Sequence, residues 1–559
     1  PSKRNFPRLR QRDLDASVSA LLESRFLERL RRKDASLFGK TPQDEELARN
    51  CLGWVTAPAA SAAAVGPLRS FAEEFKSEGW DSLAVLGMGG SILSCRVFQD
   101  CFPRNEVFPR LEVLDTIHPD AVCRFESSLD LKRTFFIVSS KSGSTVESGC
   151  LLDHFLGRVD ALFPGKAGRR FSAITDPGTS LEKTARRRAF RRIFTAPPDV
   201  GGRYSVWTAF GLVPAALSGV DVEAFLRDAL EQERRLWTSV EDNPALKLGA
   251  LLARGELTGR NKLVIKLPRR LQSFGPWIFQ MIAEALGKGG RGLLPVLREN
   301  NGSPQACAPD ELIVPMAADT NAAAEFLTWE IAACAAAFLL GANPFGEPDV
   351  ESAKAAARDI LDAVGRNAPK KARGRGPKPD FYASGIPAFC DPELKQLVFP
   401  GLRTGYSPLE KTLAAHLGRA RPGDYCAVLA YAAPEGKDAA ALEKLTALLR
   451  EKTGLATVLD FGPAYLHSGG QFYKGGKNCG LFVEIVAPPA APLPLPRRRY
   501  GLETVWRAQA EGDFTALIAA GRRVLRLDLG APGANHMAAI VNALAPRKAK
   551  KENSSQCQN

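Results

Sequence analysis

The sequence predicts an α/β protein with two doubly wound parallel-sheet domains, each a three-layer αβα sandwich, preceded by a helical segment. Short aliphatic and β-branched runs alternate along the chain with longer helical patterns, which is the signature of parallel strands joined by crossover helices. At 559 residues the chain also exceeds the size of one ordinary hydrophobic core. Hydrophobic residues make up 45% and charged residues 24%, a balance typical of globular proteins.

The strands are expected where short apolar runs end in turn residues. They are predicted at 82–88, 110–116, 133–140 and 170–176 in the first half, and at 261–267, 292–297, 311–316, 424–432, 456–462, 479–486 and 523–529 in the second. Helical patterns lie between them, for example at 91–101 and 145–162.

Composition shifts suggest the domain boundaries. We expect a helical amino-terminal segment at 1–60, a first domain at 61–245 and a second at 246–545. A stretch rich in Pro, Gly and charge at 367–380 predicts an exposed linker within the second domain. The end of the chain, 546–559, is predicted to be a disordered basic tail.

The charge balance is strongly positive, with 75 Lys and Arg against 61 Asp and Glu, a net charge of +14. Basic residues cluster at 3–33, 183–192, 366–378 and 547–551, but aromatic residues are not interleaved with them. This pattern favours a solvated surface that attracts anionic substrates over a nucleic-acid partner.

Targeting and metal signals are weak. The most apolar stretch, 331–342, is shorter than the roughly 18 residues of a membrane helix and predicts a buried helix instead. The amino terminus lacks an apolar signal core, and eleven scattered cysteines show no metal-ligand spacing. No His pair stands at metal-binding spacing either. We therefore expect a cytoplasmic protein without a metal or a membrane partner.

Two loops carry the first chemical signal. The run 83–91 (LAVLGMGGS) is a buried strand that enters clustered glycines and then a helix, and 135–147 (FFIVSSKSGSTVE) is a strand that ends in five hydroxyl residues, a Lys and a Gly. Glycines let the backbone approach an anion, while hydroxyls, an ammonium and a helix N-terminus suit a phosphate dianion. A serine-rich helix cap is the plainer alternative, but five hydroxyls exceed what a cap requires.

These loops together resemble the sugar-isomerase (SIS) domain pattern. Three later segments resemble motifs of the phosphoglucose isomerase family: 200–208 (VGGRYSVWT), 280–288 (QMIAEALGK), and Trp329-Glu330 followed by 343–354 (NPFGEPDVESAK). The nearest resemblance is to the isomerase half of bacterial transaldolase/glucose-6-phosphate isomerase fusions, seen in KDASLF, YLHSGGQFYKGG and RAQAEGDF. The resemblance covers about residues 35–530 and implies two SIS-type domains.

The resemblance also implies roles for single residues. The sugar phosphate would be held by Gly90, Ser91, Ser140, Lys141, Ser142 and Thr145. Arg203 would stabilise the enediolate oxygen, Glu284 would move the proton between C2 and C1, and Lys354 would assist ring opening. Gln280 lies one helical turn before Glu284, so both would face one side of the helix.

Physical chemistry supports two of these roles independently. Glu284 lies in an otherwise apolar helical run, and a partly desolvated carboxylate has a pKa near the working pH, as a proton-shuttling base requires. An ordinary salt-bridged Glu is the alternative. Arg203 follows two glycines, and its planar guanidinium suits developing negative charge, although an Arg that ties two loops together fits the same pattern.

The ring-opening acid departs furthest from the family pattern. The expected His does not lie between Glu284 and Lys354, and the nearest equivalent is His467, in the later run HSGGQFYKGG. Its titration near neutral pH suits the role, and Lys474 is the alternative. Two departures from the family pattern are Ala285-Leu286 after the catalytic Glu and Gly346-Glu347 after Asn-Pro-Phe.

The sequence thus predicts an aldose–ketose isomerase acting on glucose 6-phosphate and fructose 6-phosphate. The resemblance implies a homodimer with a hexose phosphate substrate. Two alternatives stay open: a dual phosphoglucose/phosphomannose isomerase, and a non-catalytic SIS-type protein that only binds a sugar phosphate.

Overall fold

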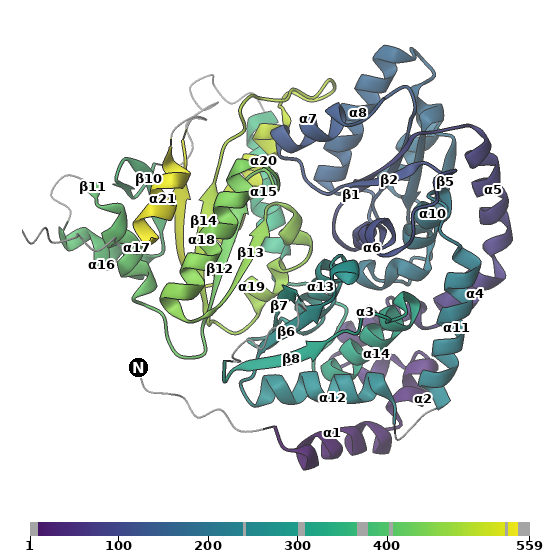
Figure 1. Ribbon diagram of the computed structural model, residues 1–559, viewed down its shortest axis with the longest axis horizontal. Coiled ribbons are helices and arrows are strands. Elements are labelled where there is room, and N and C mark those ends of the chain that lie inside the picture. Colours follow the sequence, from purple (N-terminus) through teal and green to yellow (C-terminus); the bar gives the residue numbers. More distant parts are fainter. Residues whose placement is uncertain are drawn as a thin grey trace, which may run out of the picture.

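Three β-sheets, layered with helices, form the computed structural model of the chain (Figure 1). The structure describes residues 9–238, 242–299, 308–365, 378–401, 406–530 and 535–545. The predicted tail 546–559 and most of the predicted linker 367–380 lie outside these residues.

The first sheet is parallel throughout, with strand order β2-β1-β3-β4-β5. Its strands are β1 (Ser82–Gly87), β2 (Arg110–Leu114), β3 (Thr134–Ser139), β4 (Phe171–Thr175) and β5 (Arg192–Thr195), and its helices are α6 (Leu93–Cys101), α7 (Pro119–Ser127), α8 (Val146–Leu162) and α9 (Ser180–Arg187). The strand order reverses between β1 and β3, and ligands of doubly wound sheets bind at such a switch point, beyond the carboxyl ends of the strands. Both predicted phosphate loops leave the sheet there.

A second, three-stranded parallel sheet has the order β7-β6-β8. It contains β6 (Lys262–Leu267), β7 (Leu294–Glu299) and β8 (Glu311–Pro315), and the helices around it are α11 (Val222–Thr238), α12 (Pro244–Leu257), α13 (Phe274–Leu286) and α14 (Ala322–Leu340). Helix α10 (Ala209–Leu217) instead packs on α6, β1 and β4 of the first sheet. Helix α13 contacts α6 of the first sheet, β7 and α14 of the second, and the short helix α19 (Gly470–Gly475) beside the third. It lies near the middle of the molecule in Figure 1. A helix that is surrounded in this way is apolar on nearly all faces.

The third sheet is mixed, with the order β11-β9-β10-β15-β14-β12-β13. Its strands are β9 (Phe381–Ala383), β10 (Ile386–Cys390), β11 (Tyr406–Ser407), β12 (Tyr425–Tyr431), β13 (Ala456–Phe461), β14 (Gly480–Val486) and β15 (Arg523–Asp528). Its helices are α15 (Glu351–Gly365), α16 (Pro392–Val398), α17 (Leu409–Leu417), α18 (Lys437–Thr453), α20 (Leu502–Ala519) and α21 (His536–Leu544). The strands β12 to β15 run parallel, but β10 is antiparallel to both β15 and β9. Ser384 and Gly385 join β9 to β10 with positive φ of 48° and 87°, as a tight two-residue hairpin turn requires.

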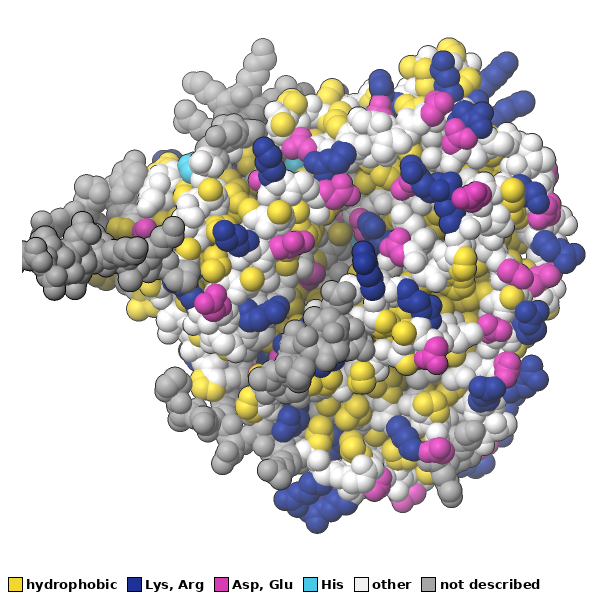
Figure 2. Space-filling view, viewed as in Figure 1, with side chains coloured by type: hydrophobic (Ala, Val, Ile, Leu, Met, Phe, Trp, Pro, Cys, Tyr) yellow, Lys and Arg dark blue, Asp and Glu magenta, His cyan; other side chains and the backbone are white. Residues whose placement is uncertain are grey.

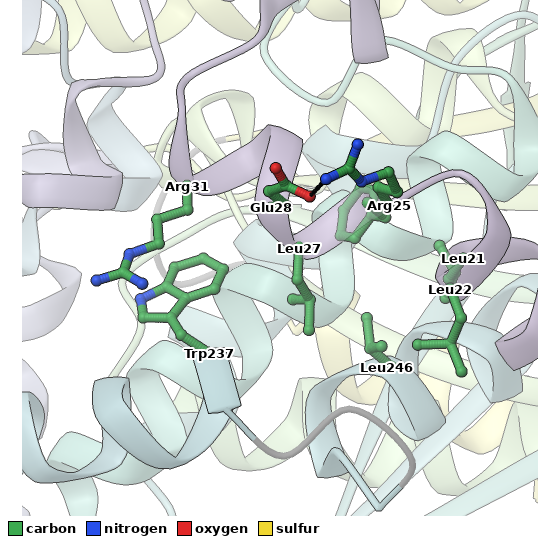
Figure 3. Close-up of a pocket in the computed structure, with 9 residues that line it drawn as sticks. Leu21, Leu22, Arg25, Leu27, Glu28, Arg31, Trp237 and Leu246 are labelled. Carbon is green, nitrogen blue, oxygen red and sulfur yellow. Dashed lines mark ion pairs between the residues drawn. The ribbon is translucent and has the colours of Figure 1, made fainter.

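Helices precede the first sheet: α1 (Gln11–Glu23), α2 (Phe26–Arg31), α3 (Pro42–Arg49), α4 (Ala57–Ala63) and α5 (Val65–Ser77). Helix α1 packs on α12 and α14, so the amino-terminal segment covers the second sheet's helices. A largely apolar pocket of about 300 Å³ remains where Leu21, Leu27, Trp237 and Leu246 meet (Figure 3). None of the predicted site residues lines it.

The eleven predicted strands are confirmed, each within two residues of its expected start and within two residues of its expected end. The additional strands β5, β9, β10 and β11 are two to five residues long, too short for a clear apolar pattern. The second-half strands divide between two sheets rather than forming one. The proposed boundaries at 1–60, 61–245 and 246–545 stay a prediction.

The apolar stretch at 331–342 is a buried helix for most of its length, as predicted. It belongs to α14, the one helix among the described residues that is long and apolar enough to cross a membrane, and 72% of its apolar window is buried inside the molecule. On the face shown in Figure 2, Lys and Arg side chains are scattered among acidic and apolar ones.

Candidate active site

Two glycines bring the first phosphate loop close to the backbone of other segments. A Cβ at Gly90 would stand 2.3 Å from the carbonyl carbon of Gly202, and a Cβ at Gly89 would stand 2.6 Å from the carbonyl oxygen of His467. Side chains larger than hydrogen are therefore excluded at both positions. The loop after β1 is thus packed between the segment that carries Arg203 and the segment that carries His467.

The second loop, after β3, forms the start of α8. Ser140 Oγ donates to Thr145 Oγ1 at 3.1 Å, and Ser142 Oγ accepts from the amide of Ser144 at 3.3 Å. Thr145 is the N-cap residue of α8 but makes no capping hydrogen bond with its side chain. Its hydroxyl and the first-turn amides of a 17-residue helix therefore face the loop without helical partners.

Lys141 points away from this helix start. Its ammonium pairs with Asp176 and donates to the carbonyl of Pro198 at 3.2 Å. Ser91 is buried, and its carbonyl accepts from Ser139 Oγ at 2.7 Å. The structure therefore holds the two loops together through Ser91, while the phosphate-binding role of the Lys141 side chain stays a prediction.

A pocket of about 260 Å³ begins at the serine-rich loop. Its lining includes Ser142, Ser144 and Thr145 on one side, and Lys354 and His467 on the other. Lys354 lies on α15 and pairs with Glu351 at 2.9 Å. Three predicted elements, far apart in sequence, thus surround one cavity.

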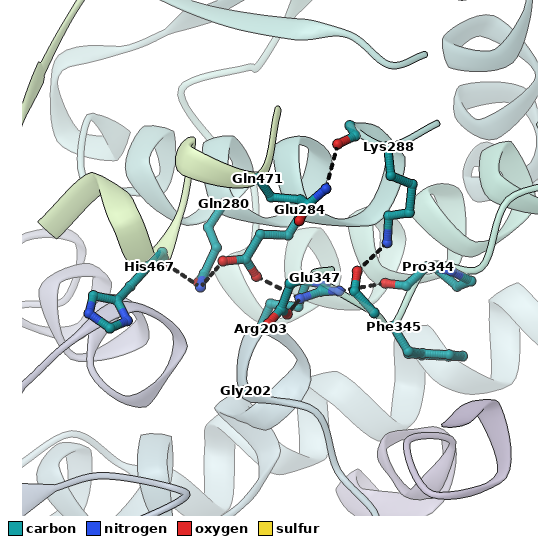
Figure 4. A network of polar contacts seen from close by, with 12 residues as sticks. Gly202, Arg203, Gln280, Glu284, Lys288, Pro344, Phe345, Glu347, His467 and Gln471 are labelled. Carbon is teal, nitrogen blue, oxygen red and sulfur yellow. Dashed lines mark hydrogen bonds and ion pairs between the residues drawn. The ribbon is translucent and has the colours of Figure 1, made fainter. Parts of the chain in front are cut away.

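Arg203 lies at the centre of a buried polar network next to this pocket (Figure 4). It lies in the 3-10 helix η5 (Gly202–Trp207), is 3% exposed, and donates from Nη1 to Glu284 Oε2 at 2.6 Å and also to Glu347. Its Nη2 donates to the carbonyl of Pro344 at 2.7 Å. One guanidinium therefore holds two carboxylates.

Gln280 connects this network to His467. Gln280 Nε2 donates to Glu284 Oε1 at 3.2 Å and to the carbonyl of His467 at 2.8 Å. As expected from their spacing of four, Gln280 and Glu284 face the same side of α13. The structure brings Arg203, Gln280, Glu284 and His467 together.

The pKa values of the two carboxyl groups beside Arg203, Glu284 and Glu347, are shifted in opposite directions. Burial raises the pKa of Glu284 to about 8, and the negative charge of Glu347 adds to the rise while Arg203 opposes it. Burial also acts to raise the pKa of Glu347, but the charge and hydrogen bond of Arg203 outweigh it and hold that pKa below its ordinary value. The shared proton of the pair therefore resides on Glu284 near neutral pH.

His467 has a carboxylate partner that sequence reasoning missed. Its Nε2 lies 2.8 Å from Glu147 Oε1, and Glu147 is 3% exposed. Burial opposes the ionisation of Glu147, but its electrostatic interaction and hydrogen bond with His467 hold its pKa below the ordinary value. Because an ionised carboxylate only accepts, His467 Nε2 donates to it, and Nδ1 is left for other chemistry.

Lys288 and Gln471 hold the backbone segment around Glu347. Lys288 Nζ donates to the carbonyls of Asn343 and Gly346, on the turn that carries Glu347, and its distance to the first is 2.8 Å. Burial and the charge of Arg203 lower the pKa of Lys288 to about 7. Gln471 bridges the carbonyl of Gly287 at 2.9 Å and Asp349 at 2.6 Å. The motif around residue 288 and the run HSGGQFYKGG were the only sequence signals for these contacts.

Lys474, the alternative to His467, is not in this network. Its ammonium is buried and pairs with Asp513, on α20. Across the described ranges, no group of three or more His, Cys, Asp or Glu side chains is arranged to hold a metal ion.

Comparisons with known proteins find their matches mainly in the first half of the chain. Residues 57–291 match the family model described as phosphoglucose isomerase. The glucose-6-phosphate isomerase of Methanocaldococcus jannaschii is 31% identical over 231 residues, 40% of this chain and 55% of that protein.

Residues 57–291 are thus similar to the phosphoglucose isomerase family. The glucose-6-phosphate isomerase of Thermus thermophilus is 29% identical over 241 residues, 43% of this chain and 56% of that protein. The chain therefore spans about half the length of the curated relatives it matches. The matched region, residues 57–291, contains both loops, Arg203, Gln280 and Glu284, whereas Lys354 and His467 lie beyond it.

A crystal structure of a glucose-6-phosphate isomerase from Chlamydia trachomatis resembles this chain with a TM-score of 0.51 and 16% identity. The likeness covers 66% of this chain and 89% of the other. At that identity it bears on the fold alone. Together with the family match, it confirms the α/β class predicted from the sequence.

Replacing Glu347 by Gln should lower the pKa of Glu284. The substitution removes a neighbouring negative charge, and Glu284 becomes the only carboxylate that pairs with Arg203 among the described residues. In an assay of phosphoglucose isomerisation, we expect the acidic limb of kcat/KM to move about one to two units lower in pH. Glu435→Gln, a change at an exposed carboxylate paired with Arg124, is the matched control and should not move it. An unchanged limb in Glu347→Gln would contradict the shared-proton description.

The raised pKa of Glu284 also predicts how stability depends on pH. Between about pH 4.5 and 8 the native state keeps a proton on Glu284 that the unfolded chain releases, so this contribution to stability is lost as pH rises. Glu284→Gln removes this pH dependence. Inside this window, the free energy of unfolding of the variant minus that of the wild type should therefore increase by about 1.4 kcal/mol for each unit that the pH rises. Urea unfolding of both proteins at pH 5, 6 and 7 measures the difference. If the free energies of unfolding of the two proteins changed equally with pH, Glu284 would be ionised in the native state.

Proposed function

We propose that this protein is a glucose-6-phosphate isomerase that interconverts glucose 6-phosphate and fructose 6-phosphate through an enediol or enediolate. One observation supports the proposal most directly. The buried network of Arg203, Gln280 and Glu284 contacts His467, and His467 lines a pocket that begins at the N-terminus of α8. Within the described part of the chain, Arg203 Nε and Gln280 Oε1 are buried without hydrogen-bond partners. Such atoms are costly unless a ligand satisfies them.

The phosphate of the substrate would bind at the start of α8. We assign Ser140, Ser142 and Thr145 as its hydroxyl donors, with the first-turn amides of α8 and the side chain of Ser91. The positive end of the helix dipole stabilises a dianion at this position. We keep Lys141 in this set for its backbone and its positive charge, since its ammonium is engaged with Asp176. Gly90 serves by allowing close approach.

The sugar would extend from the phosphate into the pocket lined by Lys354 and His467. Ring opening needs an acid at the ring oxygen and a base at the O1 hydroxyl. His467, held by Glu147, suits proton exchange with the ring oxygen. The ammonium of Lys354 donates to sugar hydroxyls and orients the ring.

Isomerisation then transfers one proton. Ionised Glu284 removes the proton from C2, the C1–C2 double bond forms, and negative charge develops on O1. The guanidinium of Arg203 stabilises that charge, with Nε as the available donor. A proton moves from O2 to O1, and Glu284 returns its proton to C1, which gives the ketose.

The remaining parts of the proposal come from the family resemblance. We propose a cytoplasmic homodimer whose partner molecule is a hexose phosphate, with no nucleic acid, membrane, metal or cofactor involved. The site residues on both sides of position 291 act as one unit in this proposal. The two SIS-type domains, 61–245 and 246–545, would both contribute to it.

Glu284→Gln is the decisive substitution for the activity. It keeps the size and the hydrogen bond to Gln280 but removes the base, so kcat should fall by about 10²–10⁴-fold with little change in substrate affinity. A coupled assay of fructose 6-phosphate conversion measures the first, and calorimetric titration with fructose 6-phosphate measures the second. Near-native turnover in Glu284→Gln would exclude it as the base.

The same assays separate the alternatives. Binding of fructose 6-phosphate by the wild type without turnover favours the non-catalytic sugar-phosphate-binding protein. Equal conversion of glucose 6-phosphate and mannose 6-phosphate favours the dual isomerase.

A further inference from the structure

A second pocket lies on the other side of the serine-rich loop. It has a volume of about 330 Å³ and shares Ser144, Thr145 and Val146 with the pocket lined by Lys354 and His467. Its distinguishing feature is four arginines in one lining: Arg187, Arg188, Arg497 and Arg498. We call it the arginine pocket.

Two triple-arginine runs, more than 300 positions apart in sequence, supply these side chains. The run 186–188 ends α9, and the run 497–499 lies in a proline-rich segment between β14 and α20. This segment packs along α8 where that helix has glycines: a Cβ at Gly149 would stand 3.0 Å from Arg498 Nη2, and one at Gly157 would stand 2.9 Å from Pro496. The fold therefore brings the two runs together on one side of α8.

The positive charge of the arginine pocket is largely unbalanced. Asp153 is the only acidic residue in its lining, and it is already paired with Arg498 Nε at 2.7 Å. Within the part of the chain that the structure describes, Arg187, Arg188 and Arg497 have no acidic partner. Like charges gathered in a concavity repel one another and attract a counter-ion.

An unsatisfied hydroxyl points to the same conclusion. Ser148, in the first turn of α8, lines the arginine pocket and is 2% exposed. Its Oγ is buried without a hydrogen-bond partner among the described residues. Buried hydroxyls are normally satisfied, and this one stands beside the amides of a helix N-terminus, where anions bind.

We propose that the arginine pocket is a second anion site, which binds a small phosphorylated ligand with at least two negative charges. Arg187, Arg188 and Arg497 are its cationic donors, and Ser148 is its buried hydroxyl donor. Ser140 and Thr145, assigned above to the substrate phosphate, also line the arginine pocket, so the two sites adjoin. The ligand is distinct from the substrate because Lys354 and His467, which would hold the sugar, line the other pocket. The site itself does not depend on the proposed isomerase activity.

Occupancy should also affect the proposed reaction, and this part does rest on the proposed function. The two pockets share Ser144 and Thr145, so two phosphate groups would approach the same helix start. Their repulsion raises the KM for hexose phosphate and leaves kcat unchanged.

Calorimetric titration of the full chain with pyrophosphate, and separately with inorganic phosphate, tests the site. We expect saturable binding with pyrophosphate preferred, because three cationic side chains face one pocket. The double variant Arg188→Ala/Arg497→Ala changes two exposed side chains and should lower the affinity for pyrophosphate by at least about tenfold. Ser148→Ala should weaken it as well. The matched control is Arg186→Ala, since Arg186 pairs with Glu182 outside the pocket, and it should bind as the wild type does.

Two results would overturn the second site. The first is pyrophosphate affinity that is absent in the wild type or unchanged in Arg188→Ala/Arg497→Ala. The second is a KM for fructose 6-phosphate that rises in the double variant as much as pyrophosphate affinity falls, because the arginine pocket would then hold the substrate's own phosphate. A protein without isomerase turnover would refute the proposed function and leave the binding result intact.

Discussion

A single buried guanidinium, Arg203, connects the parts of this molecule that the proposed chemistry requires. It enters from the first half of the chain through η5, contacts Glu284 on α13, and contacts Glu347 on the turn before α15. Charges taken out of water are tolerable only when they are paired and hydrogen-bonded, and removing one partner of a buried pair typically costs about 3–5 kcal/mol. The electrostatic requirement of Arg203 therefore fixes where three separate segments meet.

The same constraint gives Glu284 its chemical character. A carboxylate alone beside Arg203 would be strongly acidic and a poor base. Burial and the competing charge of Glu347 act in the other direction, so the pKa of Glu284 lies near the working pH. The two predicted phosphate loops and α13 complete the arrangement, because the switch point of the first sheet faces the helix that carries Gln280 and Glu284. Position and pKa thus follow from packing around one cation.

Much of the local structure could be predicted from the sequence because its signals are contiguous. A strand, turn residues and a helix follow one another at 83–91 and 135–147, and the apolar run around Glu284 predicted its burial. Contacts between distant residues could not be predicted in this way. The His467–Glu147 pair joins positions 320 apart, and the Arg203–Glu347 pair joins positions 144 apart. The division of the second-half strands into two sheets likewise depends on pairing between strands, which an apolar pattern does not encode.

Glu347 illustrates the limit best. The sequence marked it only as a departure from a family motif, whereas in the structure it is one of the two carboxylates that Arg203 contacts. The most direct test of the whole account is a crystal structure with an open-chain sugar-acid phosphate, whose carboxylate imitates the enediolate. We expect the phosphate of this ligand at the start of α8, its carboxylate on Arg203 Nε, and Glu284 beside the adjacent carbon. A ligand whose phosphate lies away from the serine-rich loop, or whose carbon chain is out of reach of Glu284, would contradict it.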